Sequence, residues 1–199
     1  HCPYTADKAR IVVQEMIDGI SLELVEKRLV TDQLVLTVGY DIENLTRPEI
    51  RKVYKGPVTT DRYGRRVPKH AHGTWNLPRA TSSSSELLEA MAALYDKIVN
   101  PALLIRRMSL SACHVVNEKM AKEREQKETF EQLDLFTDYA KKEAKEKEEQ
   151  KKRERERRMQ EALLTIKKKY GKNAVLRGMN FEEGATAKER NGQIGGHQA

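Results

Sequence analysis

Apolar side chains near the start of the chain repeat first with the period of a helix and then with that of a strand. From a cap at Thr5 or Asp7 to Lys27 they recur every three or four residues, which predicts one long amphipathic helix. Residues 33–40 then alternate, as expected of a strand. The face that this strand should bury carries Leu34, Leu36, Val38 and Tyr40.

Two further segments alternate like strands. Residues 69–81 predict a second strand, and residues 104–116 predict a third. The connection of residues 41–68 is long and contains several prolines and glycines, which is typical of a functional or mobile loop. Each later strand is expected to have one polar face, made by His70, His72, Thr74 and Asn76 in the second strand and by Arg107, Ser109 and Ser111 in the third.

A second amphipathic helix is predicted between those two strands. Ser83 lies in the serine run 82–85 and Glu86 follows this run, and the two have the spacing of a capping box. The apolar stripe that follows consists of Leu87, Leu88, Met91, Leu94, Tyr95 and Ile98. The order helix, strand, strand, helix, strand predicts an α+β fold. In it, an antiparallel sheet carries two helices on one face and leaves a polar face open to a ligand.

The rest of the chain is dominated by charge. We expect a first domain over residues 1–118, a linker over 119–138, a charged helix over 139–170 and a flexible tail over 171–199. Acid-to-base pairs four residues apart recur along the helix, as in a solvent-exposed helix. Its last part, residues 159–170, carries a short apolar stripe. This stripe is predicted to contact missing parts of a longer protein or another protein.

The chain has 199 residues and a net charge of +7, with 34% charged and only 6% aromatic residues. This balance favours a polyanionic partner. No apolar run approaches the ~18 residues of a membrane span, and no signal peptide is evident. Cys2 and Cys113 lack motif spacing, which predicts a reducing, cytoplasmic location. The chain starts at His1 in the middle of a pattern, and we therefore expect it to be the C-terminal part of a longer protein.

Positive charge is concentrated between residues 51 and 79, where eight bases accompany one acid, Asp61. Together with the polar strand faces, this concentration predicts a nucleic-acid site that contacts phosphates without reading sequence. The alternative is a basic loop that is merely well solvated. The candidate residues are Arg62, Arg65, Arg66, Lys69, His70, His72, Thr74, Asn76, Arg79 and Arg107.

The same segments offer little for catalysis. His70 and His72 share a strand face, but no neighbouring cysteine or carboxylate completes a ligand set, so we predict no metal site. Cys113 lacks the partners of a nucleophile. Asp41 and Glu43 follow a strand without a matching second segment and are interpreted as loop residues. We predict no catalytic residue and no cofactor in this chain.

A short apolar cluster interrupts the charged region at residues 132–136, with the sequence Gln-Leu-Asp-Leu-Phe. A cluster of this size cannot form a core, and in a polar tether it is better explained as a peptide that binds another protein. It resembles the sliding-clamp-binding peptide of bacterial DNA polymerases, which implies that Gln132, Leu133, Leu135 and Phe136 contact the clamp. The alternative is one turn of an ordinary helix that packs Leu133 and Phe136 on a neighbour.

The element order, with residues 29–33 (Leu-Val-Thr-Asp-Gln) and 69–74 (Lys-His-Ala-His-Gly-Thr), resembles the little-finger domain of Y-family translesion DNA polymerases of the UmuC/DinB type in Gram-positive bacteria. The likeness covers residues 2–117 and then the clamp peptide; residues 190–197 also look like the end of such proteins. It implies a β-α-β-β-α-β arrangement followed by an extended charged helical tail. The first strand is largely missing, or remains only as residues 1–4.

The resemblance implies that the domain binds the backbone of primer–template DNA while the tail tethers the polymerase to the clamp during damage bypass. It also implies that the partners of the stripe at residues 159–170 are other replication or repair proteins. The carboxylates that hold Mg²⁺ in the parent polymerase would precede this chain, so we expect no polymerase activity from it alone. Two other interpretations remain open. One is a non-catalytic basic nucleic-acid-binding adaptor that recruits the clamp or another partner. The other is a structural protein built on the charged helix, which the lack of heptads disfavours.

Overall fold

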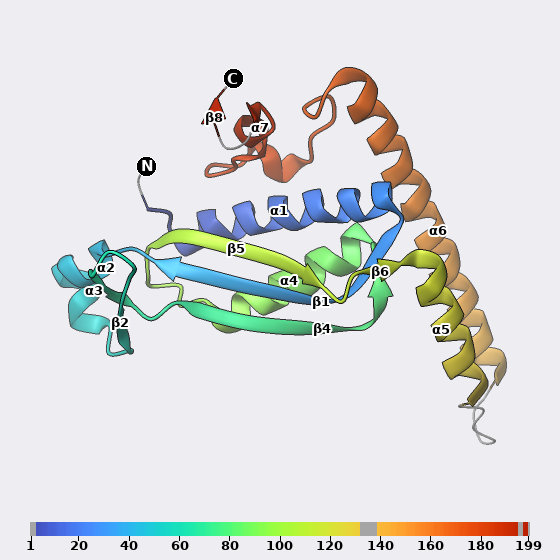
Figure 1. Ribbon diagram of the computed structural model, residues 1–199, viewed down its shortest axis with the longest axis horizontal. Helices are drawn as coiled ribbons and strands as arrows, with labels where there is room; N and C mark the ends of the chain where they lie inside the picture. Colours follow the sequence, from blue (N-terminus) through green and yellow to red (C-terminus); the bar gives the residue numbers. More distant parts are fainter. Residues whose placement is uncertain (1–2, 132–138, 195–196, 199) are drawn as a thin grey trace.

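The computed structural model describes residues 3–131, 139–194 and 197–198, with side chains over 3–125 and 147–193. The described chain is α+β, with a small antiparallel sheet and several helices (Figure 1). Its main elements are α1 (Ala6–Lys27), β1 (Leu29–Tyr40), β4 (Ala71–Thr81), α4 (Ser84–Ile98), β5 (Ile105–Cys113), β6 (Val116–Asn117), α5 (Glu118–Glu131) and α6 (Tyr139–Tyr170). Smaller ones are α2 (Glu43–Thr46), α3 (Pro48–Val53), β2 (Val58–Thr60), β3 (Arg66–Pro68), η1 (Gly178–Phe181), α7 (Ala187–Arg190), β7 (Gln193–Ile194) and β8 (His197–Gln198).

The sheet has the order β4-β1-β5, with both pairs antiparallel, and β6 pairs with the start of β1. In Figure 1 the helices α1 and α4 lie on the same side of this sheet. Both helices and all three strands agree with the predicted order. The third strand is divided, because His114 has a positive φ of 52° and turns the chain between β5 and β6.

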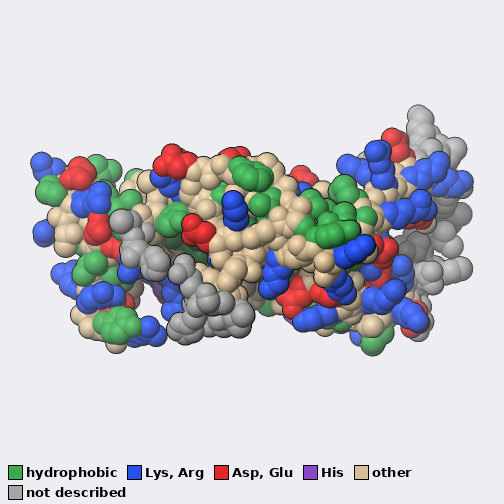
Figure 2. Space-filling model, turned by 90° about the horizontal axis from the view of Figure 1, so that it is seen from above, with side chains coloured by type: hydrophobic (Ala, Val, Ile, Leu, Met, Phe, Trp, Pro, Cys, Tyr) green, Lys and Arg blue, Asp and Glu red, His purple; other side chains and the backbone are tan. Residues whose placement is uncertain are grey.

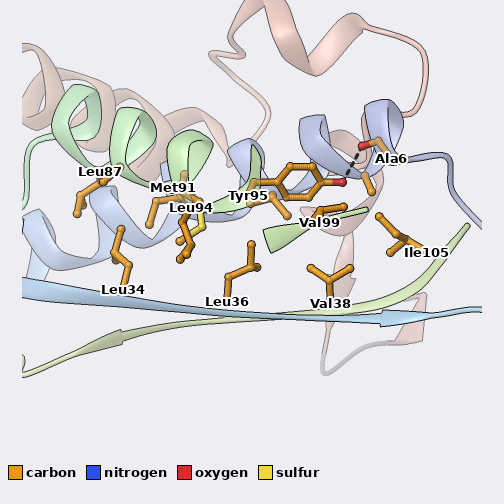
Figure 3. Packing of buried hydrophobic residues seen from close by; sticks show 14 of the residues in the cluster. Ala6, Leu34, Leu36, Val38, Leu87, Met91, Leu94, Tyr95, Val99 and Ile105 are labelled. Atoms are coloured by element: carbon orange, nitrogen blue, oxygen red, sulfur yellow. Dashed lines mark hydrogen bonds between the residues drawn. The ribbon is translucent and has the colours of Figure 1, made fainter. Parts of the chain in front are cut away.

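The core lies between the sheet and its two helices. Leu34, Leu36 and Val38 of β1 are fully buried and point toward α4 (Figure 3). They meet the stripe of α4, in which Leu87, Met91 and Leu94 are almost completely buried. The predicted buried face of β1 and the predicted stripe of α4 are thus confirmed. Tyr95 also lies in this core, where its hydroxyl donates a hydrogen bond of 2.7 Å to the carbonyl of Ala6.

Local residues fix where α4 begins and how closely it packs. Ser83 is its N-cap, and its side chain accepts from the amide of Glu86, as the capping spacing predicts. Gly73 of β4 lies under the other end of the helix. A Cβ at this position would come within 2.8 Å of Ile98 and 2.9 Å of Leu94. The glycine therefore permits the close approach of α4 to β4.

The N-terminal residues touch the outer edge of β5. Tyr4 forms an isolated antiparallel bridge with Ile105, with N–H···O distances of 2.8 and 2.7 Å. This bridge is the part of residues 1–4 that the structure describes as strand-like.

The connection between β1 and β4 differs most from its prediction. We expected a long loop over residues 41–68, whereas it contains the short helices α2 and α3 and the antiparallel hairpin β2–β3. Each of these elements spans only three to six residues. Segments so short carry too little periodicity to be recognised.

The charged helix α6 packs against the domain with a polar face. Gln160 is buried and donates to the carbonyl of Ser82 and to the hydroxyl of Ser84, at 3.0 and 2.9 Å. Glu156 accepts hydrogen bonds from the side chains of Ser83 and Ser85 and from the backbone amide of Ser85. The apolar stripe of α6 stays largely exposed, and its role as a partner surface remains a prediction.

Residues 171–193, here termed the C-terminal strap, lie along α1 on the side away from the sheet (Figure 1). The strap surrounds Glu15, whose side chain is fully buried. Its carboxylate accepts bonds from the side chains of Asn180, Thr186 and Arg190 and from the amides of Thr186 and Ala187, at 2.9–3.2 Å. We expected a flexible tail from residue 171, but the structure instead places the strap against the domain.

Among the described residues, no helix is both long enough and apolar enough to cross a membrane.

Candidate nucleic-acid interface

The hairpin β2–β3 has a tightly organised tip. The carboxylate of Asp61 accepts from the amides of Tyr63 and Arg65, both at 2.9 Å, and from the guanidinium of Arg65 at 2.8 Å. These donors lower the pKa of Asp61, with the side-chain bond from Arg65 as the largest cause. Gly64 completes the turn with a positive φ of 77°. The single acid of the basic segment thus organises the basic tip.

Tyr63 lies beside two arginines at this tip and is 65% exposed. The guanidinium carbon of Arg62 lies 4.6 Å from the centre of its ring, and that of Arg65 lies 5.0 Å away. Both distances are within the range of cation–π contacts. The tip therefore presents an aromatic ring together with two positive charges.

A bulge in β5 brings a further arginine to the surface beside the hairpin. Gly39 pairs with Arg107, but Tyr40 pairs with Ile105, so Arg106 is an extra residue in the ladder. Consequently Arg106 and Arg107 are both exposed, although neighbours in a regular strand would point to opposite faces. Arg106 was missed by the sequence prediction, which followed strict alternation. The adjacent pair of arginines in an otherwise alternating strand was the available signal.

A hollow of about 980 Å³ lies between the hairpin and the adjoining ends of β1 and β5. It brings together four of the predicted residues and the arginine of the bulge: Arg62, Arg65, His70, Arg107 and Arg106. Tyr63 contributes to the same wall, and Asp41, Glu43 and Asp61 are its acids. The lining thus has four arginines against three acids. Arg106 and Arg65 pair with Asp41 and Asp61 inside the hollow, and Glu43 pairs with Arg47 outside its lining, so the hollow keeps a small excess of positive charge.

From the hollow, the polar face of the sheet extends along β4. His72, Thr74 and Asn76 are exposed on this face, as the alternation predicts. His72 shares a hydrogen bond of 2.9 Å with Thr37 of β1, and Asn76 accepts one of 2.9 Å from Gln33. Strand β1 thus holds His72 and Asn76 in position on this face, where they can bond to phosphate oxygens.

The remaining predicted residues take different positions. Arg66 and Lys69 are exposed at the hairpin and the turn that follows it. Arg79 lies apart, because it pairs with Glu86 at the start of α4 and lines a second hollow between the end of β4, α5 and α6. Figure 2 shows Lys and Arg side chains gathered at the hairpin end of the molecule and again at the end formed by α5 and α6.

Asp41 and Glu43 have structural contacts at the edge of the hollow. The carboxylate of Asp41 accepts from the amide of Glu43 at 2.9 Å, and Glu43 pairs with Arg47. Their interpretation as loop residues agrees with these contacts. His70 and His72 do not belong to a cluster of three or more possible metal ligands within the described residues.

The predicted clamp-binding residues Gln132, Leu133, Leu135 and Phe136 lie outside the described residues. The helices on either side are described: α5 ends at Glu131 and α6 begins at Tyr139. Near the domain, Arg157 of α6 pairs with Glu118 of α5 at 3.2 Å.

Comparison of the chain with models of protein families, with curated proteins and with solved structures found no match.

Proposed function

We propose that this chain is the C-terminal region of an error-prone Y-family translesion DNA polymerase of the UmuC/DinB type. In this proposal the sheet domain binds the backbone of primer–template DNA, and the peptide at residues 132–136 tethers the enzyme to the sliding clamp. The observation that carries the proposal is the basic hollow joined to an open polar sheet face. Packing does not account for the polar face, because the core lies on the opposite side of the sheet.

The arrangement suits a phosphate backbone better than a small acidic ligand. The basic residues are spread over the hairpin, the bulge of β5 and the start of β4, so they can contact several phosphates in succession. The short polar side chains of β4 add hydrogen-bond donors without the reach to read base edges deep in a groove.

The order of elements supports the little-finger assignment. The described chain supplies α-β-β-α-β of the β-α-β-β-α-β arrangement. The bridge between Tyr4 and Ile105 lies where a preceding strand would join the outer edge of β5. The polymerase carboxylates and their Mg²⁺ belong, in this proposal, to a part of the parent protein that precedes this chain.

The DNA part of the proposal is tested by titrating labelled duplex DNA with the full chain at several salt concentrations. Replacing Arg62, Arg65 and Arg66 by alanine should weaken binding and reduce the salt slope by about 0.9 for each phosphate that the variant no longer neutralises. Lys151, Lys152 and Arg155 of α6, replaced together, provide a charge-matched control. An unchanged slope in the hairpin variant would remove the hairpin from the interface.

The clamp part is tested separately by calorimetry with a bacterial sliding clamp. Replacing Leu135 and Phe136 by alanine should abolish clamp binding, because the two side chains are the apolar anchors of the proposed peptide. The affinity for DNA should not change. Clamp binding that survives both substitutions would refute the peptide assignment.

A second candidate is a non-catalytic adaptor that binds nucleic acid and recruits the clamp or another partner. It shares both binding surfaces with the first proposal, and the exposed stripe of α6 at Met159, Ile166 and Tyr170 favours it as a further protein contact. Whether metal-binding carboxylates are encoded before His1 separates the two candidates. A polymerase requires metal-binding carboxylates there, whereas an adaptor does not.

A further inference from the structure

The tip of the β2–β3 hairpin is organised more tightly than simple phosphate binding requires. Phosphates need only positive charge and hydrogen-bond donors, which flexible arginines supply. Here Tyr63, a large aromatic residue, is 65% exposed, and packing against the core does not explain its position. Its backbone amide is held by Asp61, and Gly64 with φ of 77° closes the turn behind it. The turn thus fixes the backbone that carries the ring of Tyr63.

The two arginines beside the ring are held differently. Arg65 is anchored, because Asp61 accepts from both its backbone amide and its guanidinium. Both guanidinium groups lie over the ring of Tyr63, but the contacts of Arg62 are with Tyr63 itself, through the ring and through a hydrogen bond to its hydroxyl. A flat group that approaches the ring can therefore displace Arg62 at small cost while Arg65 stays in place.

We propose that Tyr63 is a stacking platform for an unpaired base of single-stranded nucleic acid. The unpaired strand continues from the duplex bound on the sheet, so this inference rests on the proposed function. Bases inside a duplex have both faces covered by their neighbours, and only an unpaired base can offer a face to the ring. When a base stacks on Tyr63, Arg62 leaves the ring and pairs with an adjacent phosphate.

The surroundings of the ring fit this ligand. The hollow beside Tyr63 has a volume of about 980 Å³, and Arg65, His70, Arg106 and Arg107 line it. Aromatic rings next to a cationic groove are the common arrangement for single-stranded nucleic acid, in which the ring holds the base and the groove holds the backbone. The neighbours of Tyr63 in the hollow are mostly charged or polar, which suits a charged strand better than an apolar protein surface.

The test compares three labelled DNA probes by fluorescence anisotropy with the full chain: a blunt duplex, the same duplex with one strand extended, and the extension alone. Tyr63→Ala should weaken binding of the extended duplex about tenfold, a loss within the range for one base stacked on an aromatic ring. Its affinity for the blunt duplex should stay unchanged, whereas Tyr63→Phe should retain the wild-type affinity for both.

The chain contains a matched control for this substitution. Tyr170 is 67% exposed and has the amine of Lys169 at 5.1 Å from its ring centre, but it lies at the end of α6. Tyr170→Ala should leave the affinity for every probe unchanged. A base analogue whose fluorescence is quenched by stacking, placed along the extension, should be quenched by wild-type protein and less so by the Tyr63→Ala variant.

The outcomes separate this inference from the proposed function. If wild-type protein binds the blunt duplex but Tyr63→Ala has no effect on the extended one, the stacking role is wrong and the duplex interface stands. Equal losses on blunt and extended duplexes would also overturn it, because Tyr63 would then act on the backbone. If the wild-type chain binds none of the probes, both fail. Thermal unfolding of the variants checks that each remains folded.

Discussion

The helices α4 and α6 both pack against the domain, but they are attached by opposite kinds of surface. Helix α4 uses its apolar stripe, with Leu87, Met91 and Leu94 buried against the sheet. Helix α6 turns its apolar stripe outward, with Met159 53% and Tyr170 67% exposed, and docks through polar side chains. An apolar stripe in the sequence therefore indicates which face of a helix packs against the domain only where the domain offers a matching apolar surface.

The serine run explains the orientation of α6. Ser84 lies at a junction of three helices, where its hydroxyl is 2.6 Å from that of Ser21 in α1 and 2.9 Å from the amide of Gln160 in α6. Beside it, the carboxylate of Glu156 lies at the N-terminus of α4, where the helix dipole favours negative charge. Because the buried side chains of Ser21, Ser84 and Gln160 all have hydrogen-bond partners, the polar contact carries little desolvation cost.

The largest effect is expected from truncating an apolar side chain that packs α4 against the sheet. Leu94→Ala should lower the free energy of unfolding by about 2–5 kcal/mol, because Leu94 is 1% exposed and its loss leaves a cavity between α4 and the sheet. Chemical denaturation of the full chain measures the loss. Lys97→Ala, on the exposed side of the same helix, is the control and should change little. A loss under about 1 kcal/mol for Leu94→Ala would mean that the core repacks around the gap.

The next largest effect is expected at Glu15, which attaches the strap. Glu15→Gln keeps the size of the side chain but removes its charge. It also replaces one acceptor oxygen by an NH2 group, which cannot accept the hydrogen bonds that the strap amides donate to the carboxylate. Opening of the strap should become easier by about 1–3 kcal/mol. Hydrogen exchange at residues 180–191 measures this local opening. Exchange rates equal to wild type would show that Glu15 does not hold the strap.

The carboxylate of Glu15 should also make the stability of the strap depend on pH. Burial alone would raise the pKa of Glu15, but the hydrogen bonds from Asn180, Thr186 and Ala187 and the charge of Arg190 outweigh it, so the pKa lies below the usual 4.5. Its contribution to strap stability is therefore complete above pH 4.5 and is lost as the pH falls through the lowered pKa. Burial raises the pKa of nearby Asp18, whose protonation acts in the opposite direction.

Comparing wild type with the Glu15→Gln variant separates the contribution of Glu15 to the pH dependence from that of Asp18. Strap opening in wild type should become easier as the pH falls below 4.5, whereas the variant should lack that part of the dependence. Hydrogen exchange followed across the acid range provides the measurement. Identical profiles would assign the pH dependence to groups other than Glu15.

A smaller effect is expected for the polar attachment of α6. Gln160→Ala leaves the carbonyl of Ser82 and the hydroxyl of Ser84 with fewer partners, and opening of α6 should become easier by about 1 kcal/mol. Protection of the amides of α6 should fall while those of α4 keep their protection. Equal losses in both helices would show that they open together and would weaken the contrast between them.

The smallest effect is expected at the exposed stripe of α6. Ile166→Ala should change stability by less than about 0.5 kcal/mol, because the side chain is 38% exposed and alanine suits a helix. Thermal unfolding measures it. A loss comparable to that of Leu94→Ala would mean that the stripe is part of the packing and that the two helices are attached in the same way.

Parts of the candidate site were predictable from the sequence for a simple reason. The faces of β1 and β4 follow from alternation, so the exposed row of His72, Thr74 and Asn76 was correctly predicted. Arg106 was not predicted, because the bulge in β5 depends on pairing with Gly39 and Tyr40 across the sheet. The hairpin that presents Tyr63 was also missed, since three-residue strands leave almost no periodic signal.

By itself, the sequence determined the order of the elements of the sheet domain, the buried faces of β1 and α4, and the cap at Ser83, because each depends on residues close together in the chain. Only the tertiary structure decided the rest: the hollow at the hairpin, the attachment of α6 to the serine run and the position of the strap around Glu15. The contacts of α6 with the serine run and of the strap with Glu15 join polar groups from 71 to 175 residues apart. Hydrogen bonds between such distant groups depend on position and direction, which a one-dimensional pattern of hydrophobicity does not record.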